Sequence, residues 1–120
     1  MNSSSDDTLQ VERRGHVAVL TLNRPQAMHA INLQLRGLIH DTLDALRHDS
    51  TVRSVVLTAS GDKAFCAGMD LREFAQIMAA TPLTEMRRFR WEKGDGLAQF
   101  DKPIIAAVNG LAIGGGVELA

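Results

Sequence analysis

Two short apolar runs rich in β-branched residues constrain the fold of this chain most strongly. The first, RSVVLTAS, covers residues 53–60, and the second, KPIIAAVNG, covers residues 102–110. Each run is continuous rather than alternating, which is typical of strands buried on both faces of a sheet. Segments with helical patterns lie between them. The sequence therefore predicts an α/β fold in which parallel strands are joined by right-handed crossovers.

The residues before the first run predict a hairpin followed by a long helix. In LQVERRGHVAVLTLNRP, residues 9–25, Gly15 and His16 separate two β-rich pieces, and Pro25 ends the second piece. From residue 27 to about residue 48, apolar residues recur at steps of three and four. This spacing predicts an amphipathic helix with one buried stripe, formed by Ile31, Leu35, Leu38, Ile39, Leu43 and Leu46.

Two more segments have helical patterns. DLREFAQIMAA, residues 70–80, begins with Asp70 and has Glu73 three residues later, which is a capping-box pattern. We therefore assign Asp70 mainly to helix initiation. TPLTEMRRFRWEKGDGLAQF, residues 81–100, has Pro82 near its start and Gly94 and Gly96 in its later part.

Composition excludes several classes of protein. With 120 residues, 45% hydrophobic residues and a net charge of -1, the chain is typical of one globular domain, and its scattered charges favour neither a nucleic-acid partner nor a membrane surface. Cys66 is the single cysteine, and the four histidines lack metal-site spacing, so we expect no disulfide and no metal. The polar start, MNSSSDDT, is unlike a signal peptide and predicts a disordered tail over residues 1–8. These features favour a cytoplasmic protein.

Two loops follow the predicted strands at the edge of the sheet where ligands bind in α/β folds. They are FCAGMD, residues 65–70, and NGLAIGGG, residues 109–116, and each opens a helix. The first backbone N–H groups of a helix lack internal partners and carry partial positive charge. Glycine leaves such donors open to a substrate oxygen, and Gly68 also permits an unusual backbone angle. Two converging N–H groups would make an oxyanion hole, in which one donor typically contributes about 2.7–4 kcal/mol to catalysis.

Glu118 is a candidate general acid or base. It follows Gly115 by three residues, so both lie on one helix face, and its side chain leans back toward the helix N-terminus. We expect its carboxylate to overhang the pocket among the apolar neighbours Ile113, Val117 and Leu119, an environment suited to proton transfer.

Each of these features also has a structural interpretation. The glycines Gly114, Gly115 and Gly116 could form a tight turn that only needs room, and Glu118 could be a solvated acid favoured by the helix dipole. Cys66 is better explained as a small buried residue than as a nucleophile. The glycines do not match a dinucleotide-binding or Walker phosphate-binding motif.

Three segments together resemble the crotonase superfamily, the enoyl-CoA hydratase/isomerase enzymes. They are NRPQAMHAIN, AFCAGMDLREF and DKPIIAAVNGLAIGGGVELA, and their order and separation fit over residues 11–120. The resemblance implies a β-β-α spiral, the ClpP/crotonase fold, and an assembly into homotrimers or hexamers.

The resemblance also implies roles for particular residues. The oxyanion donors would be the backbone N–H groups of Met69 and Gly115, and Glu118 would be the first of two catalytic glutamates. The acyl-CoA would contact seven residues, namely Met28, Ala30, Ala67, Gly68, Asp70, Leu71 and Gly114. No cofactor is implied, because coenzyme A is part of the thioester substrate. Hydration of a 2-enoyl-CoA is the favoured reaction, while isomerase, hydrolase, decarboxylase and dehalogenase chemistry stay open.

The chain departs from the family pattern in two ways. His29 stands where the family has Asn, which affects the local turn and its contact with CoA. Family members also continue beyond Ala120, so we expect residues 9–120 to form the N-terminal portion of the domain, with the second glutamate lying later. An alternative of another class is a non-catalytic relative that retains at most CoA binding or subunit contacts.

One basic segment has two interpretations. MRRFRWEK, residues 86–93, could present its arginines and lysine to a CoA phosphate or an RNA. A solvated helix with an aromatic inner side is the stronger interpretation.

Overall fold

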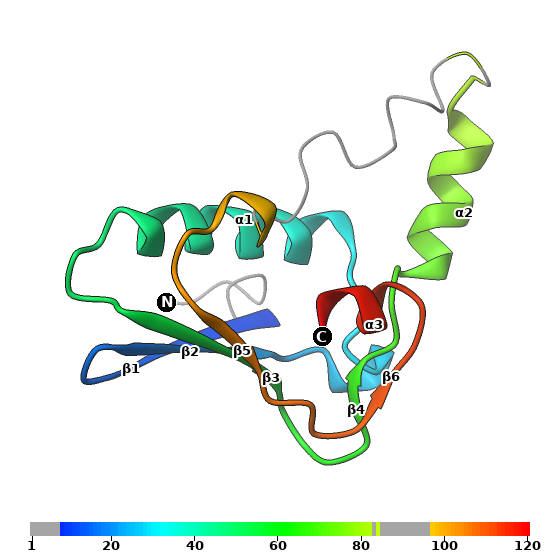
Figure 1. Ribbon diagram of the computed structural model, residues 1–120. Helices are drawn as coiled ribbons and strands as arrows, with labels where there is room; N and C mark the ends of the chain where they lie inside the picture. The colour runs from blue at the N-terminus through cyan, green and yellow to red at the C-terminus, as the bar shows by residue number, and fades with distance from the viewer. Residues whose placement is uncertain (1–7, 83, 85–96) are drawn as a thin grey trace, which may run out of the picture.

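The computed structural model describes residues 8–82, 84 and 97–120. The chain forms a mixed α/β fold with a four-stranded sheet in the order β1-β2-β3-β5 and a two-stranded sheet of β4 and β6 (Figure 1). The basic segment of residues 86–93 and the tail predicted over residues 1–8, apart from Thr8, lie outside the described residues.

The predicted hairpin is confirmed. Strands β1 (Leu9–Arg14) and β2 (Val17–Leu22) pair antiparallel, with Leu9 opposite Leu22 and Arg14 opposite Val17. Gly15 lies in the connecting turn with φ of 61°, a conformation that glycine adopts without a steric penalty. The hairpin therefore supplies the outer edge of the larger sheet.

The predicted parallel strands are also confirmed. Strand β3 (Ser54–Ala59) pairs parallel with β2, and β5 (Ile104–Ala106) pairs parallel with β3. The expectation that both faces of these strands are buried is wrong for the described residues. Val55 and Leu57 are buried, but their neighbours along β3 are half-buried, and Ile105 is 57% exposed. Helix α1 covers one face of the sheet, and the other face is less well covered (Figure 1).

Helix α1 (Leu33–Arg47) packs its apolar stripe onto the sheet. Its buried residues recur at helical spacing and meet the inward-facing residues of β2 and β3. Each fully buried Leu or Ile contributes about 1.5–3 kcal/mol relative to an exposed one. The core of the molecule therefore lies between α1 and the sheet, and the α1 residues in it are Leu35, Ile39, Leu43 and Leu46.

The predicted start of this helix at residue 27 is wrong. Pro25–Ala27 forms a short 3-10 helix, η2, and Met28 and His29 then adopt left-handed conformations with φ of 51° and 56°. Helix α1 begins only after Asn32, whose side chain accepts a hydrogen bond from the Leu35 amide at 2.8 Å. Ile31, which fits the helical stripe, instead forms a parallel bridge with Met69.

The second sheet is a feature that sequence patterns did not predict. Strands β4 (Ala64–Cys66) and β6 (Leu111–Ala112) are too short to show a periodicity, and they pair parallel with each other. Helix α2 (Leu71–Ala80) follows β4 and projects away from the rest of the molecule, and α3 (Gly115–Leu119) follows β6 (Figure 1). The segment of residues 81–100 was also predicted to be helical, and its described part contains the short 3-10 helix η4 (Leu97–Gln99).

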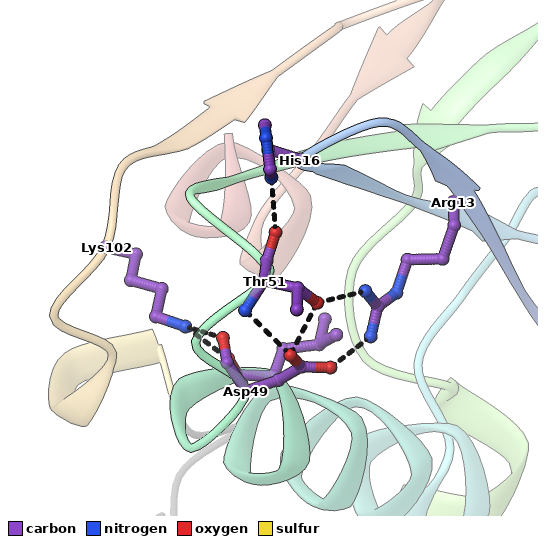
Figure 2. A network of polar contacts seen from close by, with 6 residues as sticks. Arg13, His16, Asp49, Thr51 and Lys102 are labelled. Carbon is purple, nitrogen blue, oxygen red and sulfur yellow. Dashed lines mark hydrogen bonds and ion pairs between the residues drawn. The ribbon is translucent and has the colours of Figure 1, made fainter.

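A polar network fixes the end of α1 to the hairpin and to the segment before β5 (Figure 2). The Asp49 carboxylate accepts hydrogen bonds from the Thr51 amide and hydroxyl and from Arg13. Lys102 donates to the carbonyl oxygens of Leu46 and Asp49, each at 2.6 Å, where a cation also complements the helix dipole. The hydrogen bond from the Thr51 hydroxyl, followed by that from Arg13, holds the pKa of Asp49 well below its ordinary value.

In the described part of the chain, no helix combines the length and the apolar character needed to cross a membrane.

Candidate active site

The two glycine-containing loops lie side by side because the strands before them are neighbours. Strands β4 and β6 run parallel with Cys66 opposite Ala112, so their carboxyl ends meet at one edge. The Ile113 amide donates to the Cys66 carbonyl oxygen at 3.1 Å, which continues the pairing to the start of the glycine run. The structure thus brings together the loops that sequence analysis placed at one edge of a sheet, although the strands that do so are β4 and β6.

Each glycine at this junction has a different structural reason. Gly114 has φ of 54° and ψ of -120°, which side-chain-bearing residues rarely adopt. A Cβ atom on Gly116 would lie 1.9 Å from the Cys66 carbonyl oxygen, so α3 can approach β4 this closely only with glycine there. Gly68 has φ of 95°, and a Cβ atom on it would lie 2.8 Å from the Ile113 carbonyl oxygen. Lack of room therefore accounts for Gly68 and Gly116, whereas the backbone conformation accounts for Gly114, where an added Cβ would meet no atom within 4 Å.

The Met69 and Gly115 amides are close together and uncommitted. A Cβ atom added to Gly115 would lie 3.8 Å from the Met69 nitrogen, and one added to Gly68 would lie 3.1 Å from the Gly115 nitrogen. Within residues 8–82, 84 and 97–120, neither amide donates a hydrogen bond to another residue. The space requirement at Gly115 is ordinary, since its nearest contact from a Cβ would be 3.6 Å. Two adjacent free donors are what an oxyanion hole requires.

Glu118 lies on α3 one turn after Gly115, as the spacing predicted. The expected apolar surroundings are not formed by the described residues, because Glu118 itself is exposed and Ile113 and Val117 are 52% and 60% exposed. Leu119 is buried and joins the hydrophobic core. The five-residue helix turns Leu119 inward, and the residues around Glu118 face solvent.

Most of the predicted substrate-binding residues line one cavity of about 490 Å³. Ala30, Ala67, Asp70 and Leu71 contribute to it, and Met69 lies on the same wall. Met28 lies instead in a second cavity of about 350 Å³, together with His29 and Lys63. Leu71 is 76% exposed and gives the first cavity an apolar rim. These volumes are within the range of small-molecule sites.

Asp70 initiates α2 as predicted. Its carboxylate accepts hydrogen bonds from the Arg72 and Glu73 amides at 3.1 and 3.2 Å. The reciprocal contact of a capping box is absent, because the Glu73 carboxylate accepts from the Leu33 amide at 2.6 Å and so joins the start of α1 to α2.

Arg24 is a residue of this site that sequence analysis missed. Its guanidinium donates to the Asp70 carboxylate at 3.0 Å and to the Ala30 carbonyl oxygen, and the Arg24 and Asp70 side chains are only 13% and 18% exposed. The Glu73 amide and then Arg24 lower the pKa of Asp70. An ion pair across 46 residues has no signal in a single sequence.

His29 is buried, with 2% of its surface exposed, and bridges two loops. Its Nδ1 accepts the Arg24 amide at 2.9 Å, and its Nε2 lies 2.8 Å from the Ser60 carbonyl oxygen. Because an amide only donates and a carbonyl only accepts, the proton sits on Nε2 and the ring is neutral. Histidine is among the few residues other than glycine that are enriched in the left-handed conformation, which His29 adopts here.

Cys66 is a buried residue of β4, as expected, and not an accessible thiol. Burial raises the pKa of its thiol, which keeps the sulfur protonated and unreactive. The Gly68 amide donates to its Sγ at 3.4 Å, so the thiol helps to shape the loop. Across the described ranges, no group of three or more His, Cys, Asp or Glu side chains is placed to hold a metal ion.

The described residues thus form an α/β fold in which two glycine-containing loops lie side by side next to a cavity. The sequence matches the enoyl-CoA hydratase/isomerase family over residues 12–120, and the chain belongs to that family. The fold prediction is thereby confirmed at the level of the family.

Known relatives agree with this assignment. The crotonyl-CoA hydratase of Syntrophomonas wolfei is 39% identical over 114 residues, which cover 95% of this chain and 44% of that protein. A mitochondrial 3-hydroxyisobutyryl-CoA hydrolase of Danio rerio is 35% identical over 122 residues, covering all of this chain and 32% of the relative. The crystal structure of carnitinyl-CoA hydratase from Mycobacterium avium superimposes with a TM-score of 0.77 at 41% identity, covering 94% of this chain and 42% of the other. The chain thus spans less than half the length of these relatives.

Proposed function

We propose that this chain carries the oxyanion hole and the first proton-transfer residue of an acyl-CoA-binding enzyme, and that the reaction is hydration of a 2-enoyl-CoA. The observation that carries the proposal is the pair of adjacent amides of Met69 and Gly115, which donate no hydrogen bond within the described part of the chain, beside a cavity of about 490 Å³. As water adds to the enoyl group, negative charge develops on the thioester oxygen. Two fixed N–H donors stabilise that charge without having to reorganise.

The residues around the cavity have distinct proposed roles. Ala30, Ala67 and Leu71 contact the acyl-CoA, with Asp70 holding the loop at the start of α2. Met28 contacts a more distant part of the substrate from the neighbouring cavity. Glu118 exchanges a proton with water or with the α-carbon, and Gly68 and Gly114 shape the backbone beneath the thioester. The homotrimer or hexamer implied by the family resemblance belongs to the same proposal.

Two substitutions at one position test the oxyanion role. Gly115→Pro removes the amide proton at the first position of α3, where proline is otherwise tolerated in helices. Gly115→Ala keeps the amide and adds a Cβ at ordinary contact distances, so it is the matched control. We expect turnover of crotonyl-CoA to fall about 100-fold or more in the proline variant and much less in the alanine variant. Equal losses in both variants would contradict the role of the amide.

Glu118→Gln tests the proton-transfer role. The amide is close to isosteric with the carboxylate but cannot exchange a proton, so we expect the turnover rate to fall about 100-fold or more while acyl-CoA binding persists. Unchanged turnover would remove Glu118 from the mechanism.

A second reaction is favoured by the relative that is a hydrolase. The same two donors would stabilise the tetrahedral intermediate of thioester cleavage, so the site alone serves either chemistry. Release of free coenzyme A from a 3-hydroxyacyl-CoA would identify hydrolysis, and formation of the 3-hydroxyacyl thioester from crotonyl-CoA would identify hydration. Binding of the thioester with neither product would favour the non-catalytic alternative, which agrees with the exposed surroundings of Glu118.

A further inference from the structure

The loop that carries the Met69 amide is held mainly by the backbone of the preceding turn, residues 24–31. The Ala67 amide donates to the Met28 carbonyl oxygen at 3.1 Å. The Ile31 amide donates to the Gly68 carbonyl oxygen at 2.7 Å, and the Ile31 carbonyl oxygen accepts from the Asp70 amide at 2.9 Å. These bonds lie on both sides of Met69. The position of the Met69 amide therefore follows the position of this turn.

The ring of His29 holds this turn of residues 24–31 in place. Its Nδ1 accepts from the Arg24 amide, which closes the turn on itself, and its Nε2 donates to the Ser60 carbonyl oxygen in the β3–β4 connection. The ring is 2% exposed, so water does not compete for either bond. One side chain thus ties the turn to the end of the core strand β3.

The loop that contains Ser60 is itself held in place by Asn109, which follows strand β5. The Asn109 side-chain amide donates to the Ala59 and Gly61 carbonyl oxygens at 2.9 and 2.8 Å, on either side of Ser60. The Ser60 hydroxyl donates to the Asn23 side chain at 2.9 Å. The Ser60 carbonyl is therefore a fixed acceptor, and its bond to His29 transmits that position to the turn.

We propose that His29 is a positioning residue for the oxyanion hole, acting on the Met69 amide through the turn of residues 24–31. This inference rests on the proposed function. A displacement of about 1 Å at a catalytic group can reduce the rate about 100-fold. His29 touches the amide only through the backbone bonds of Met28 and Ile31, so its loss changes catalysis without removing a donor.

Two substitutions test the contacts of the ring. His29→Ala removes both nitrogens, and with them the bonds to the Arg24 amide and to the Ser60 carbonyl oxygen. His29→Gln places an amide nitrogen near the position of Nε2 and keeps the donor to Ser60. His40→Asn, at a half-buried histidine on α1 remote from the loops, is the matched control.

The experiment measures the carbonyl stretching frequency of crotonyl-CoA labelled with ¹³C at the thioester carbon, bound to the chain, together with its dissociation constant and any turnover. Hydrogen bonds to the carbonyl oxygen lower this frequency, and a purely structural role of His29 in stability would not change it in the folded, saturated protein. We expect His29→Ala to lose about half or more of the shift seen in the wild type and to bind with an affinity within about threefold. His29→Gln should retain most of the shift, because it keeps the bond to Ser60, and His40→Asn should retain all of it.

The outcomes separate the two proposals. If the wild type binds the thioester without a frequency shift, or does not bind it, the proposed function fails. If the wild type shows the shift and His29→Ala retains it in full, the positioning role fails. Should His29→Ala not fold, a lost shift in His29→Gln would equally overturn the role assigned to the Ser60 bond.

Discussion

The sheet with α1 and the unit formed by β4, β6 and α3 are stabilised in different ways. Between α1 and the sheet, aliphatic side chains such as Leu35, Ile39 and Val55 are fully buried. The second unit also buries side chains, such as Phe65 and Leu119, but its loops meet backbone against backbone, with Gly116 against Cys66 and Gly68 against Ile113. The α2 helix that follows β4 buries none of its residues. Side-chain packing thus stabilises the first region, whereas in the second the absence of side chains at particular glycines also sets how closely the loops approach.

Because of this difference, substitutions in the core and substitutions at the glycine contacts should affect the protein in different ways. A packed core tolerates changes of shape that conserve volume, and it loses stability when volume is removed. A close backbone approach tolerates no added atom, whatever the volume. Substitutions in the two regions should therefore give different combinations of stability and site geometry, which can be read from unfolding and from amide chemical shifts.

The largest effect on stability is expected for Ile39→Ala in the core. Ile39 is fully buried between α1 and the sheet, so truncation leaves a cavity and should lower the free energy of unfolding by about 2–5 kcal/mol. Ile39→Val, the matched control, should cost about 0.5–1.5 kcal/mol. Urea denaturation measures both values. A loss in the alanine variant no larger than in the valine variant would show that the core is not close-packed there.

Gly116→Ala should disturb the second unit. The added Cβ would need to displace α3 from β4, which should cost about 1–3 kcal/mol and shift the amide resonances of residues 114–118. The resonances of the hairpin and α1 should stay in place. Unchanged shifts around Gly115 in a stable protein would contradict the close approach described for this junction.

Asp70→Asn should weaken the link between the two regions. Asparagine is also a good helix cap, so the substitution mainly removes the ion pair with Arg24, and we expect the free energy of unfolding to fall by about 1.5–2 kcal/mol near neutral pH. Asp41→Asn, at an exposed carboxylate on α1, is the control and should change it by less than about 0.5 kcal/mol.

The same variant has an expected pH dependence. The pKa of Asp70 is lowered in the folded protein, by the Glu73 amide and then by Arg24, from an ordinary value of 3.8. Its contribution to stability is therefore complete above that value and is lost as the pH falls through the lower folded value. The difference between wild type and Asp70→Asn should shrink as the pH falls through 3.8 and below it. A stability difference that grows as the pH falls would show that the pKa of Asp70 is raised, not lowered, in the folded protein.

Gly37→Ala should give the smallest effect, with the opposite sign. Gly37 lies within α1 and is exposed, and a Cβ atom added to it would meet no other atom within 4 Å. Alanine should therefore raise the free energy of unfolding by about 0.5–1 kcal/mol. Thermal unfolding would detect the gain. If Gly37→Ala destabilised the protein, free space around a glycine would not explain which glycines can be replaced.

The sequence predicted the elements that have periodicity or caps. The hairpin around Gly15, the stripe on α1 and the Asp70 cap are local patterns, and the structure has all three. The start of α1 was misplaced because Ile31 fits the helical stripe. In the structure, the left-handed conformations of Met28 and His29 prevent a helix there, and Asn32 caps the helix that follows.

The candidate site was predicted in outline but not in its supports. The Met69 and Gly115 loops were recognisable from glycines and family resemblance, yet β4 and β6, which bring them together, are too short to leave a pattern. The contacts of Arg24 with Asp70 and of His29 with Ser60 join residues far apart in the chain, and a single sequence contains no signal of such pairs. The apolar environment expected for Glu118 depended partly on Ile113 and Val117, which face solvent among the described residues, whereas Leu119 turns into the core.

The central claim is that the Met69 and Gly115 amides together bind a thioester oxygen, and a nuclear magnetic resonance titration tests it most directly. The chain is titrated with a non-reactive saturated acyl-CoA thioester and, in parallel, with coenzyme A alone. We expect both amide protons to move downfield with the thioester, and coenzyme A alone to move neither by a comparable amount. Saturable binding of the thioester with both amide protons unmoved would contradict the claim.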